Sequence, residues 1–464
     1  MKSQHCAFVF AICFLAPSPI DCLAAQDLER TEVVHAIDSI VNRPIEAGQI
    51  AGASVAVVQG VDTILIRAYG FADLEYHIPT PDRAIYEIGS VTKQFTGAAI
   101  LQLVEAGKLH LDAVFTEYLP EYPGEAHGIT VRRLMDHTSG IKGYTEMPGF
   151  GAVAARSLPR DSLVAMFSAA PLDFPPGEAM IYNNSAYFLL GLIIEAVSGE
   201  SYADYVSEHL FVPAGMPDSR YCSSNAIIER RAHGYDASPE GLVRKSYIDH
   251  TWPYSAGSLC STAHDLVAWN QALHGDGAGG NILTTESYQE LITPGALNDG
   301  TALRYAKGLS VFESDGRRII EHGGGIPGFL SQVTYYPEED LSVIVLVNTA
   351  GPPGPGSIAA EIATLLLGEL SDPTERDFLG DLAVLEGTYR GPGRGSDLAL
   401  TVGTDDNGLT VAFGERQPSH VRFVDGLTFA SGNTRYTFVM GEHAAPRLKV
   451  DQIGGLYVLT RDSS

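Results

Sequence analysis

Several features are scarce in this 464-residue chain, and each scarcity excludes a class of protein. Cysteine occurs only five times, and no Cys/His group has the spacing of a zinc site, so we expect no structural metal. No Gly-rich phosphate loop or dinucleotide fingerprint is present. Positive charge is also scarce, because 30 Lys and Arg stand against 56 Asp and Glu. The resulting net charge of −26 argues against nucleic acid or an anionic membrane as a main partner.

The apolar run near the N-terminus is too short to cross a bilayer as a helix. The chain begins with a basic residue, continues with an apolar run over residues 7–16, and offers small residues for cleavage near Ala24 or Ala25. We therefore predict a signal peptide over residues 1–25 and a periplasmic or secreted protein without a stable membrane span. A retained membrane anchor is the alternative, and the sequence leaves cleavage open.

Only Cys222 and Cys260 lie outside the predicted signal peptide. Disulfides persist in oxidising compartments, so an exported chain could pair these two residues. The sequence leaves their pairing open, because it does not show that the two side chains meet.

Length and composition predict a globular protein with more than one domain. The chain is too long for one small core, and its contents of 45% hydrophobic and 19% charged residues are typical of folded chains. Helical patterns fill the middle of the chain, and strand-like runs flank them on both sides. We predict an α+β domain over residues 26–370, with an antiparallel sheet closed by both termini and a helical region.

The last part of the chain has a different pattern. Residues 371–377 are polar and include Pro373, which indicates a linker over residues 371–379. Residues 380–464 alternate apolar and polar side chains around turns such as Asn407-Gly408. This pattern predicts a small all-β domain, with a barrel or a sandwich as its form.

Two Ser-x-x-Lys pairs occur, Ser90/Lys93 and Ser139/Lys142, and chance alone would give about one, so context must choose between them. Ser90 begins a helical pattern that ends at Gly107, and residues three apart share a helix face. A serine needs a base to become a good nucleophile, and a lysine can serve only if its pKa is lowered, for example by burial. The plain alternative is that Ser90 caps the helix and Lys93 is solvated.

The second pair lies in a turn. Gly140 and Gly143 bracket the segment, so no rigid element would hold Ser139 against Lys142. We interpret this pair as accidental. His137 precedes it, and turn chemistry favours a turn or capping histidine over a general base.

Two further motifs follow along the chain. Tyr182 and Asn184 stand just before a helical pattern, and His322 ends a strand-like run followed by the three glycines of residues 323–325. Each has a plain interpretation: a packed aromatic for Tyr182, a helix cap for Asn184 and a flexible surface turn for the glycines. Three consecutive glycines are also expected where a backbone must approach another group closely.

Taken together, Ser-x-x-Lys at Ser90, Tyr-x-Asn at Tyr182 and His-Gly-Gly at His322 resemble the serine β-lactamases and penicillin-recognising enzymes. The resemblance is to the class C β-lactamase-like branch, which includes D-alanyl-D-alanine carboxypeptidases, D-aminopeptidases and esterases. Segments such as "ITVRRLMDHTSGI", "PAGMPDS" and "SAGSLCSTAHDLVAW" also look like this family. The matching part covers roughly residues 30–370, and the tail looks like the lipocalin-like β-domain that some members append.

The resemblance implies a mechanism without a metal or a cofactor. Ser90 would attack a carbonyl and form an acyl-enzyme that water then releases. Lys93 and Tyr182 would share the proton transfers, with Tyr182 kept acidic by Lys93. The backbone N–H groups of Ser90 and Gly325 would form the oxyanion hole.

The resemblance also implies a set of substrate-binding residues. Asn184 would orient Lys93 and the acyl side chain, while His322, Gly323 and Gly324 would line the site. His322 stands where many lactamases have Lys. Gly323 stands where many members have a Thr hydroxyl that binds a substrate carboxylate, which favours D-aminopeptidase or esterase action, although a remote Arg could bind that carboxylate instead.

The sequence therefore predicts an exported serine hydrolase that acts through Ser90 on an amide or ester. The expected substrate is a small molecule or peptide that contains a D-amino acid, as for a D-aminopeptidase or a D-Ala carboxypeptidase. The cell wall is a candidate source of such a peptide. Alternatives are an esterase or β-lactamase of the same family, or a β-lactam or cell-wall binding protein without turnover. The substrate, the oligomeric state and the role of the tail stay open.

Overall fold

The computed structural model describes residues 19–275, 279–314, 316–368, 377–441 and 445–462, with side chains from residue 30 onward. Most of the predicted signal peptide, residues 1–18, and most of the predicted linker, residues 371–376, lie outside this part of the chain. Within it, no helix is both long and apolar enough to cross a membrane.

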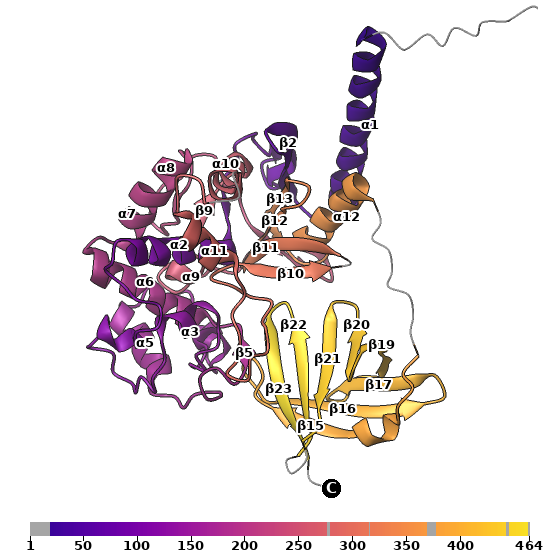
Figure 1. Cartoon of the computed structure of the whole chain (residues 1–464). Helices are drawn as coiled ribbons and strands as arrows, with labels where there is room; N and C mark the ends of the chain where they lie inside the picture. Colours follow the sequence, from indigo (N-terminus) through magenta and orange to yellow (C-terminus); the bar gives the residue numbers. More distant parts are fainter. Residues whose placement is uncertain (1–18, 276–278, 315, 369–376, 442–444, 463–464) are drawn as a thin grey trace, which may run out of the picture.

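A seven-stranded antiparallel sheet forms the centre of the first domain (Figure 1). Its strands follow the order β10-β11-β12-β13-β1-β2-β3, so strands from both ends of the domain lie side by side. Their bounds are β1 Gly52–Gln59, β2 Asp62–Asp73, β3 Ile78–Pro79, β10 Ser310–Ser314, β11 Arg317–Ile326, β12 Phe329–Tyr336 and β13 Leu341–Val347.

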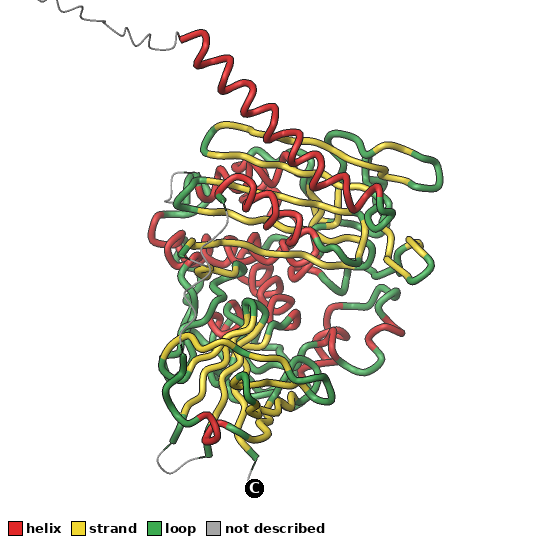
Figure 2. The backbone as a smooth tube through the Cα atoms, turned by 90° about the vertical axis from the view of Figure 1, so that its right-hand side faces the viewer, coloured by secondary structure: helices red, strands yellow, loops and turns green. Residues whose placement is uncertain are grey.

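The two terminal helices, α1 (Pro19–Glu46) and α12 (Pro355–Leu367), cover one face of this sheet (Figure 2). Val55 and Val57 of β1 point to that face and pack with Ile37 of α1, while Ala56 and Val58 point to the opposite face. β1 is therefore apolar on both sides, as expected for a strand between two layers. The predicted α+β domain with a sheet closed by both termini is confirmed.

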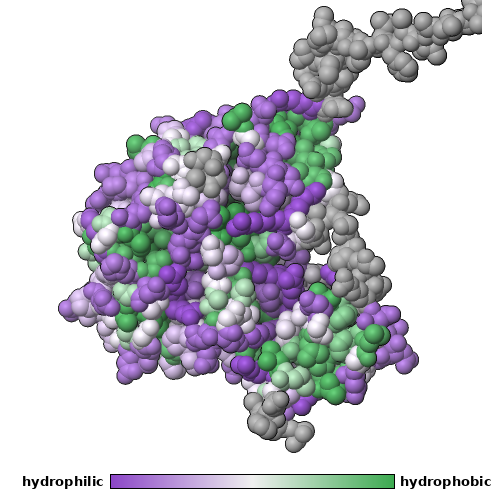
Figure 3. Space-filling model, viewed as in Figure 1, coloured by the Kyte–Doolittle hydropathy of each residue, from purple (hydrophilic) through white to green (hydrophobic). Residues whose placement is uncertain are grey.

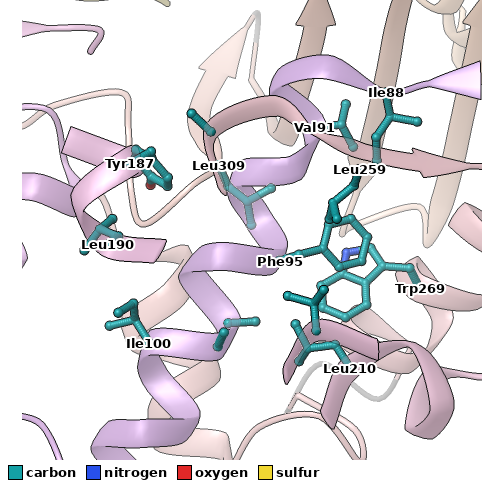
Figure 4. Close-up of a cluster of buried hydrophobic side chains, with 14 of the residues drawn as sticks. Ile88, Val91, Phe95, Ile100, Tyr187, Leu190, Leu210, Leu259, Trp269 and Leu309 are labelled. Carbon is teal, nitrogen blue, oxygen red and sulfur yellow. The ribbon is translucent and has the colours of Figure 1, made fainter. Parts of the chain in front are cut away.

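The helical region covers the other face of the sheet. The centre of this region is the ring of Phe95, which lies 4.2 Å from the Trp269 ring, centroid to centroid (Figure 4). The helix α2 that carries Phe95 is buried almost throughout. The helices are α2 Thr92–Glu105, α3 Val131–Met135, α4 Phe150–Val153, α5 Arg160–Ser168, α6 Asn184–Ser198, α7 Tyr202–Val206, α8 Val212–Ala214, α9 Tyr254–Gly257, α10 Ala263–His274 and α11 Thr285–Ile292.

The first domain also contains two small three-stranded sheets. One contains β14 (Thr349–Ala350), β7 (Tyr235–Ser238) and β8 (Gly241–Arg244). The other contains β4 (Tyr86–Glu87), β9 (Leu259–Ser261) and β6 (Arg220–Tyr221).

A disulfide joins Cys222, which follows β6, to Cys260 in β9. Both residues are buried, and their Cα atoms lie 5.3 Å apart. Cys260 also faces Glu87 across the β4–β9 pair, so the disulfide crosslinks the small sheet from which the chain runs into Ser90. The pairing that the sequence left open is therefore present.

The C-terminal part forms a ten-stranded sheet that closes almost into a barrel (Figure 1). Its interior holds large apolar side chains such as Tyr389, Leu400, Phe438 and Leu448, so the predicted barrel-like domain is confirmed. Figure 3 shows a mostly polar surface, with hydrophobic residues over parts of this sheet. Its own strands are β15 Gly387–Gly391, β16 Leu398–Asp405, β17 Gly408–Phe413, β18 Ser419–His420, β19 Arg422–Asp425, β20 Thr428–Ser431, β21 Thr434–Val439, β22 Arg447–Gln452 and β23 Gly455–Arg461.

The tenth strand of this sheet comes from the first domain. β5 (Met180–Ile181) pairs with β23, with Ile181 opposite Gly455 and Met180 opposite Leu456. The next residue, Tyr182, continues the contact, because its backbone N–H donates to the Gly454 carbonyl at 3.3 Å. The two domains therefore share a sheet immediately before Tyr182.

The disulfide yields a stability prediction. The double variant C222A/C260A should lose about 4 kcal/mol of unfolding free energy, because the crosslink closes a chain segment with a sequence separation of 38 residues. Thermal unfolding of oxidised wild type and of the variant should show a clearly lower melting temperature for the variant. Wild type treated with a strong reductant should approach the variant, and coincident curves for oxidised wild type and variant would contradict the prediction.

Candidate active site

Ser90 lies in a tight turn between β4 and α2. The residues of this turn form a short 3₁₀ helix, η1 (Gly89–Val91), that runs directly into α2. Gly89 has a φ of +49°, and a Cβ at this position would lie 2.8 Å from the backbone nitrogen of Gly325. Glycine is therefore required here, and its absence of a side chain lets β11 pass directly against the turn that presents Ser90. The predicted placement of Ser90 at a helix start is confirmed.

Lys93 lies one turn further along, with its side chain entirely buried. Its Nζ lies 3.2 Å from Ser90 Oγ, 2.8 Å from Asn184 Oδ1 and 2.8 Å from the Ala256 carbonyl oxygen. Burial lowers the pKa of Lys93 well below its ordinary value, and the positive charge of Arg394 lowers it further. A neutral amine in this position can accept the proton of Ser90, and the alternative of a solvated Lys93 is wrong.

Tyr182 brings a phenol to the same point. Its ring centroid lies 4.7 Å from Lys93 Nζ, and its hydroxyl is buried without a hydrogen-bond partner among the described residues. Burial raises the pKa of Tyr182 above its ordinary value, and the nearby Ser90 hydroxyl opposes this only in part. The expected acidic Tyr182 is therefore wrong: the phenol keeps its proton, and the amine of Lys93 is the group suited to act as base.

Asn184 is the first residue of α6, but it does not cap this helix. The cap is Asn183, whose side chain accepts from the Ala186 N–H at 2.9 Å. The Asn184 side chain is free to hold Lys93 through Oδ1, while its Nδ2 donates to Thr145 Oγ1 at 3.2 Å. The interpretation of Asn184 as a helix cap is wrong, and its place beside Lys93 agrees with the orienting role that the resemblance implies.

His322 is buried in β11 and is neutral. Its Nδ1 lies 2.6 Å from the Gly323 carbonyl oxygen, and because a carbonyl only accepts, Nδ1 must carry the proton and donate it. The other ring nitrogen, Nε2, therefore accepts from the Tyr305 hydroxyl at 3.0 Å. Burial lowers the pKa of His322 to about 3, and the neighbouring Lys93 acts in the same direction. This residue therefore provides no positive charge where many lactamases have one.

The three glycines after His322 belong to β11 and do not form a flexible turn. A Cβ at Gly324 would lie 2.0 Å from the Ile88 carbonyl oxygen, so only glycine fits there. Gly323 is exposed, and a side chain there would come 3.0 Å from Gln332 Oε1. The run therefore serves the close approach of this strand to the Ser90 turn.

The second Ser-x-x-Lys pair is engaged elsewhere. Lys142 Nζ binds Asp173 Oδ1 at 2.5 Å, and Ser139 Oγ accepts from the Ile141 N–H at 3.4 Å. His137 has a φ of +61°, and its Nδ1 accepts from the backbone N–H of Asn183 at 3.2 Å, as expected of a turn or capping histidine.

His137 also has a contact that the sequence did not indicate. Its ring centroid lies 4.4 Å from that of Tyr182, and burial lowers the pKa of His137 well below its ordinary value. A neutral imidazole thus packs against the candidate phenol.

Arg394 is a site residue that the sequence analysis missed. It lies in the loop between β15 and β16 of the C-terminal domain, and its guanidinium carbon lies 5.3 Å from the centroid of the Tyr182 ring. No motif surrounds it in the sequence, and only its position in the folded chain reveals it.

A cavity of about 370 Å³ opens in front of Ser90. Both site residues and apolar side chains line it, and they come from β11 of the first domain as well as from the β15–β16 loop of the second. It is lined by Ser90, Tyr144, Thr145, Phe150, Gly151, Ala154, Asn184, Ser246, Tyr247, Ile248, Pro253, Ala256, Gly257, Gly325, Ile326, Pro327 and Arg394.

Comparisons with known proteins agree with this geometry. The family model "Beta-lactamase" matches residues 37–367. Protein flp of Staphylococcus aureus (strain MW2) is 27% identical over 316 residues, which are 67% of this chain and 62% of the relative. Penicillin-binding protein 4* of Bacillus subtilis (strain 168) is 29% identical over 310 residues, or 64% of this chain and 67% of the relative. The chain thus spans about three fifths to two thirds of these relatives.

Solved structures match as well. The octameric penicillin-binding protein homologue from Pyrococcus abyssi has a TM-score of 0.63 at 24% identity and covers 92% of this chain and 100% of its own, which shows the fold. The D-amino acid amidase from Ochrobactrum anthropi SV3, complexed with D-phenylalanine, has a TM-score of 0.61 at 26% identity. That match covers 72% of this chain and 99% of the amidase.

The burial of Lys93 predicts how Ser90 reacts. Labelling of Ser90 by a fluorophosphonate probe should become faster as pH rises through the lowered pKa of Lys93, because only the neutral amine can accept a proton. K93M and K93R should slow labelling by about 10²- to 10⁴-fold at neutral pH.

Thermal unfolding of K93M shows whether slower labelling of Ser90 reflects loss of the base or a misfolded variant. In unfolded protein Lys93 regains its ordinary, higher pKa and takes up a proton, so its burial disfavours the folded state below that pKa. K93M removes this effect and should melt no lower than wild type. Undiminished labelling of K93M would contradict the role of Lys93 as base.

Proposed function

Because the chain belongs to the β-lactamase family, we propose that it is a serine hydrolase in which Ser90 forms an acyl-enzyme with an amide or ester. The observation that carries this proposal is the buried Lys93 amine, of lowered pKa, 3.2 Å from Ser90 Oγ. A weak nucleophile beside a neutral base on a rigid, buried helix is the arrangement that nucleophilic catalysis needs.

The chemistry follows from the positions of these groups. Lys93 accepts the Ser90 proton as Oγ bonds to the substrate carbonyl carbon, and the negative charge on the carbonyl oxygen is stabilised by the N–H groups of Ser90 and Gly325. Tyr182 donates its phenolic proton to the leaving nitrogen or oxygen as the scissile bond breaks, and regains a proton from Lys93. Water then attacks the ester and releases Ser90 by the reverse transfers.

For the substrate we propose a D-amino-acid-containing peptide. The structural similarity to a D-amino acid amidase and the relationship to a penicillin-binding protein support this class. Gly323 lacks the hydroxyl that many family members use for a carboxylate, which makes β-lactamase activity the weaker alternative. Esterase activity, and binding of a β-lactam or cell-wall fragment without turnover, are the other outcomes that the experiment separates.

We further propose that the mature protein is periplasmic or secreted. The buried Cys222–Cys260 disulfide supports this, because such bonds persist in oxidising compartments.

A substrate panel tests the proposed activity. Purified protein should hydrolyse D-aminoacyl anilides or acyl-D-Ala-D-Ala faster than L-aminoacyl anilides and nitrocefin, and S90A should lose both turnover and fluorophosphonate labelling. Faster turnover of nitrophenyl esters alone would indicate an esterase, and a single acylation without turnover would indicate a binding protein. Labelling that persists in S90A would remove Ser90 from the nucleophile's role.

The position of Tyr182 gives a sharper test of proton donation. Y182F should slow amide hydrolysis by about 10²- to 10⁴-fold but affect a nitrophenyl ester much less, because nitrophenolate leaves without a proton. The variant should melt no lower than wild type, since it removes a buried hydroxyl without a partner among the described residues. Equal loss on both substrates would argue against the donor role.

A further inference from the structure

The cavity in front of Ser90 has a distinctive charge. Arg394 is the one charged side chain among the described residues that line it. The other lining groups include apolar side chains such as Phe150 and Ile326 and polar ones such as Asn184. An anionic group that enters this cavity therefore meets an opposite charge, whereas an ammonium group meets a like charge.

Glu146 holds Arg394 through an ion pair. Nε and one Nη of the guanidinium contact Glu146 Oε1 at 2.7 and 2.6 Å, and Glu146 Oε2 accepts from Thr145 Oγ1 at 2.8 Å. Glu146 is not among the residues that line the cavity, although its charge also acts on Lys93 and Tyr182, whose pKa values it raises. A guanidinium has five N–H donors, and the Glu146 contacts use only part of them. The side chain of Arg394 is 44% exposed, which leaves the rest of the fork accessible.

Arg394 is also close to the reacting groups. Its Cζ lies 5.3 Å and Lys93 Nζ 4.7 Å from the centroid of the same Tyr182 ring. In a peptide the C-terminal carboxylate carbon is only two bonds from the scissile nitrogen, so a group bound by Arg394 would be attached close to the bond that Ser90 attacks. Arginine is well suited to this task, because its planar fork matches a carboxylate.

We propose that Arg394, supplied by the C-terminal domain, binds the free C-terminal carboxylate of a peptide substrate and takes the place of the hydroxyl that Gly323 lacks. This inference rests on the proposed function and narrows it: among D-amino-acid-containing peptides it selects the carboxypeptidase type over the aminopeptidase type. It also makes the C-terminal domain part of the substrate site.

A matched pair of peptides tests the inference. Wild type should hydrolyse N-acetyl-D-Ala-D-Ala at least about tenfold better, in kcat/KM, than the same peptide with a C-terminal amide. R394A should lose about 10- to 100-fold more activity on the acid than on the amide, because a charge-assisted hydrogen bond is lost only with the acid, whereas loss of the charge that lowers the Lys93 pKa affects both peptides alike. An acid preference that survives in R394A, or a wild type that prefers the amide, would overturn the inference.

E146Q separates substrate binding from a purely structural role. This variant removes the negative charge of Glu146 and keeps the Arg394 guanidinium, so the acid preference should persist or increase. If R394A and E146Q lose activity equally on both peptides, Arg394 is only a contact between the domains and the inference fails.

A protection assay distinguishes failure of this inference from failure of the proposed function. N-acetyl-D-alanine should protect Ser90 from fluorophosphonate labelling better than N-acetyl-D-alaninamide in wild type, and equally in R394A. Labelling without such a difference overturns the role of Arg394 and leaves the serine hydrolase intact. A wild type without any labelling of Ser90 removes the proposed function, and this inference falls with it.

Discussion

The Lys93 amine lies inside the protein interior, and most other features of the site depend on that burial. An ammonium ion removed from water carries a large desolvation cost, so a buried lysine tends to lose its proton. The burial comes from α2 itself, whose Phe95 packs on Trp269 and whose other faces contact α6, α9 and α11. The same packing that stabilises the helix thus makes its lysine a base, and the hydrogen bonds of its amine with Ser90 Oγ, Asn184 Oδ1 and the Ala256 carbonyl oxygen fix the position of that base.

Burial also keeps the titratable side chains around Lys93 uncharged. His322 and His137 are held neutral by burial, and the phenols of Tyr182 and Tyr305 keep their protons for the same reason. Around the nucleophile there is therefore a cluster of uncharged donors and acceptors, which can exchange protons without separating charge in a medium of low dielectric constant. The permanent charges at its border are those of Arg394, which lines the cavity, and of Glu146, which pairs with it.

The sequence predicted the features that depend on neighbouring residues. Hydrophobic periodicity indicated the helical middle of the first domain, the strands that flank it and the barrel-like tail, and the resemblance to the penicillin-recognising enzymes indicated Ser90, Lys93, Tyr182 and His322. Long-range features were not predictable in this way. β5 has only two residues, too few to show an alternating pattern, and its partner β23 lies more than 270 residues away along the chain. Arg394 lacks a motif, and the sign of the Tyr182 pKa shift depends on burial that no local pattern reveals.

The shared β5–β23 pairing has a consequence for how such proteins can be recombined. Backbone hydrogen bonds join the end of the chain to the residues just before Tyr182, and the neighbouring strand β15 leads into the loop of Arg394. A β-domain grafted from a relative would have to reproduce this register as well as its own fold, because a shift of one residue turns alternate side chains to the opposite face. In this chain the first domain and its tail are thus joined by backbone pairing next to Tyr182, and a chimaera that exchanges one without the other has to restore the position of Tyr182 as well as the fold.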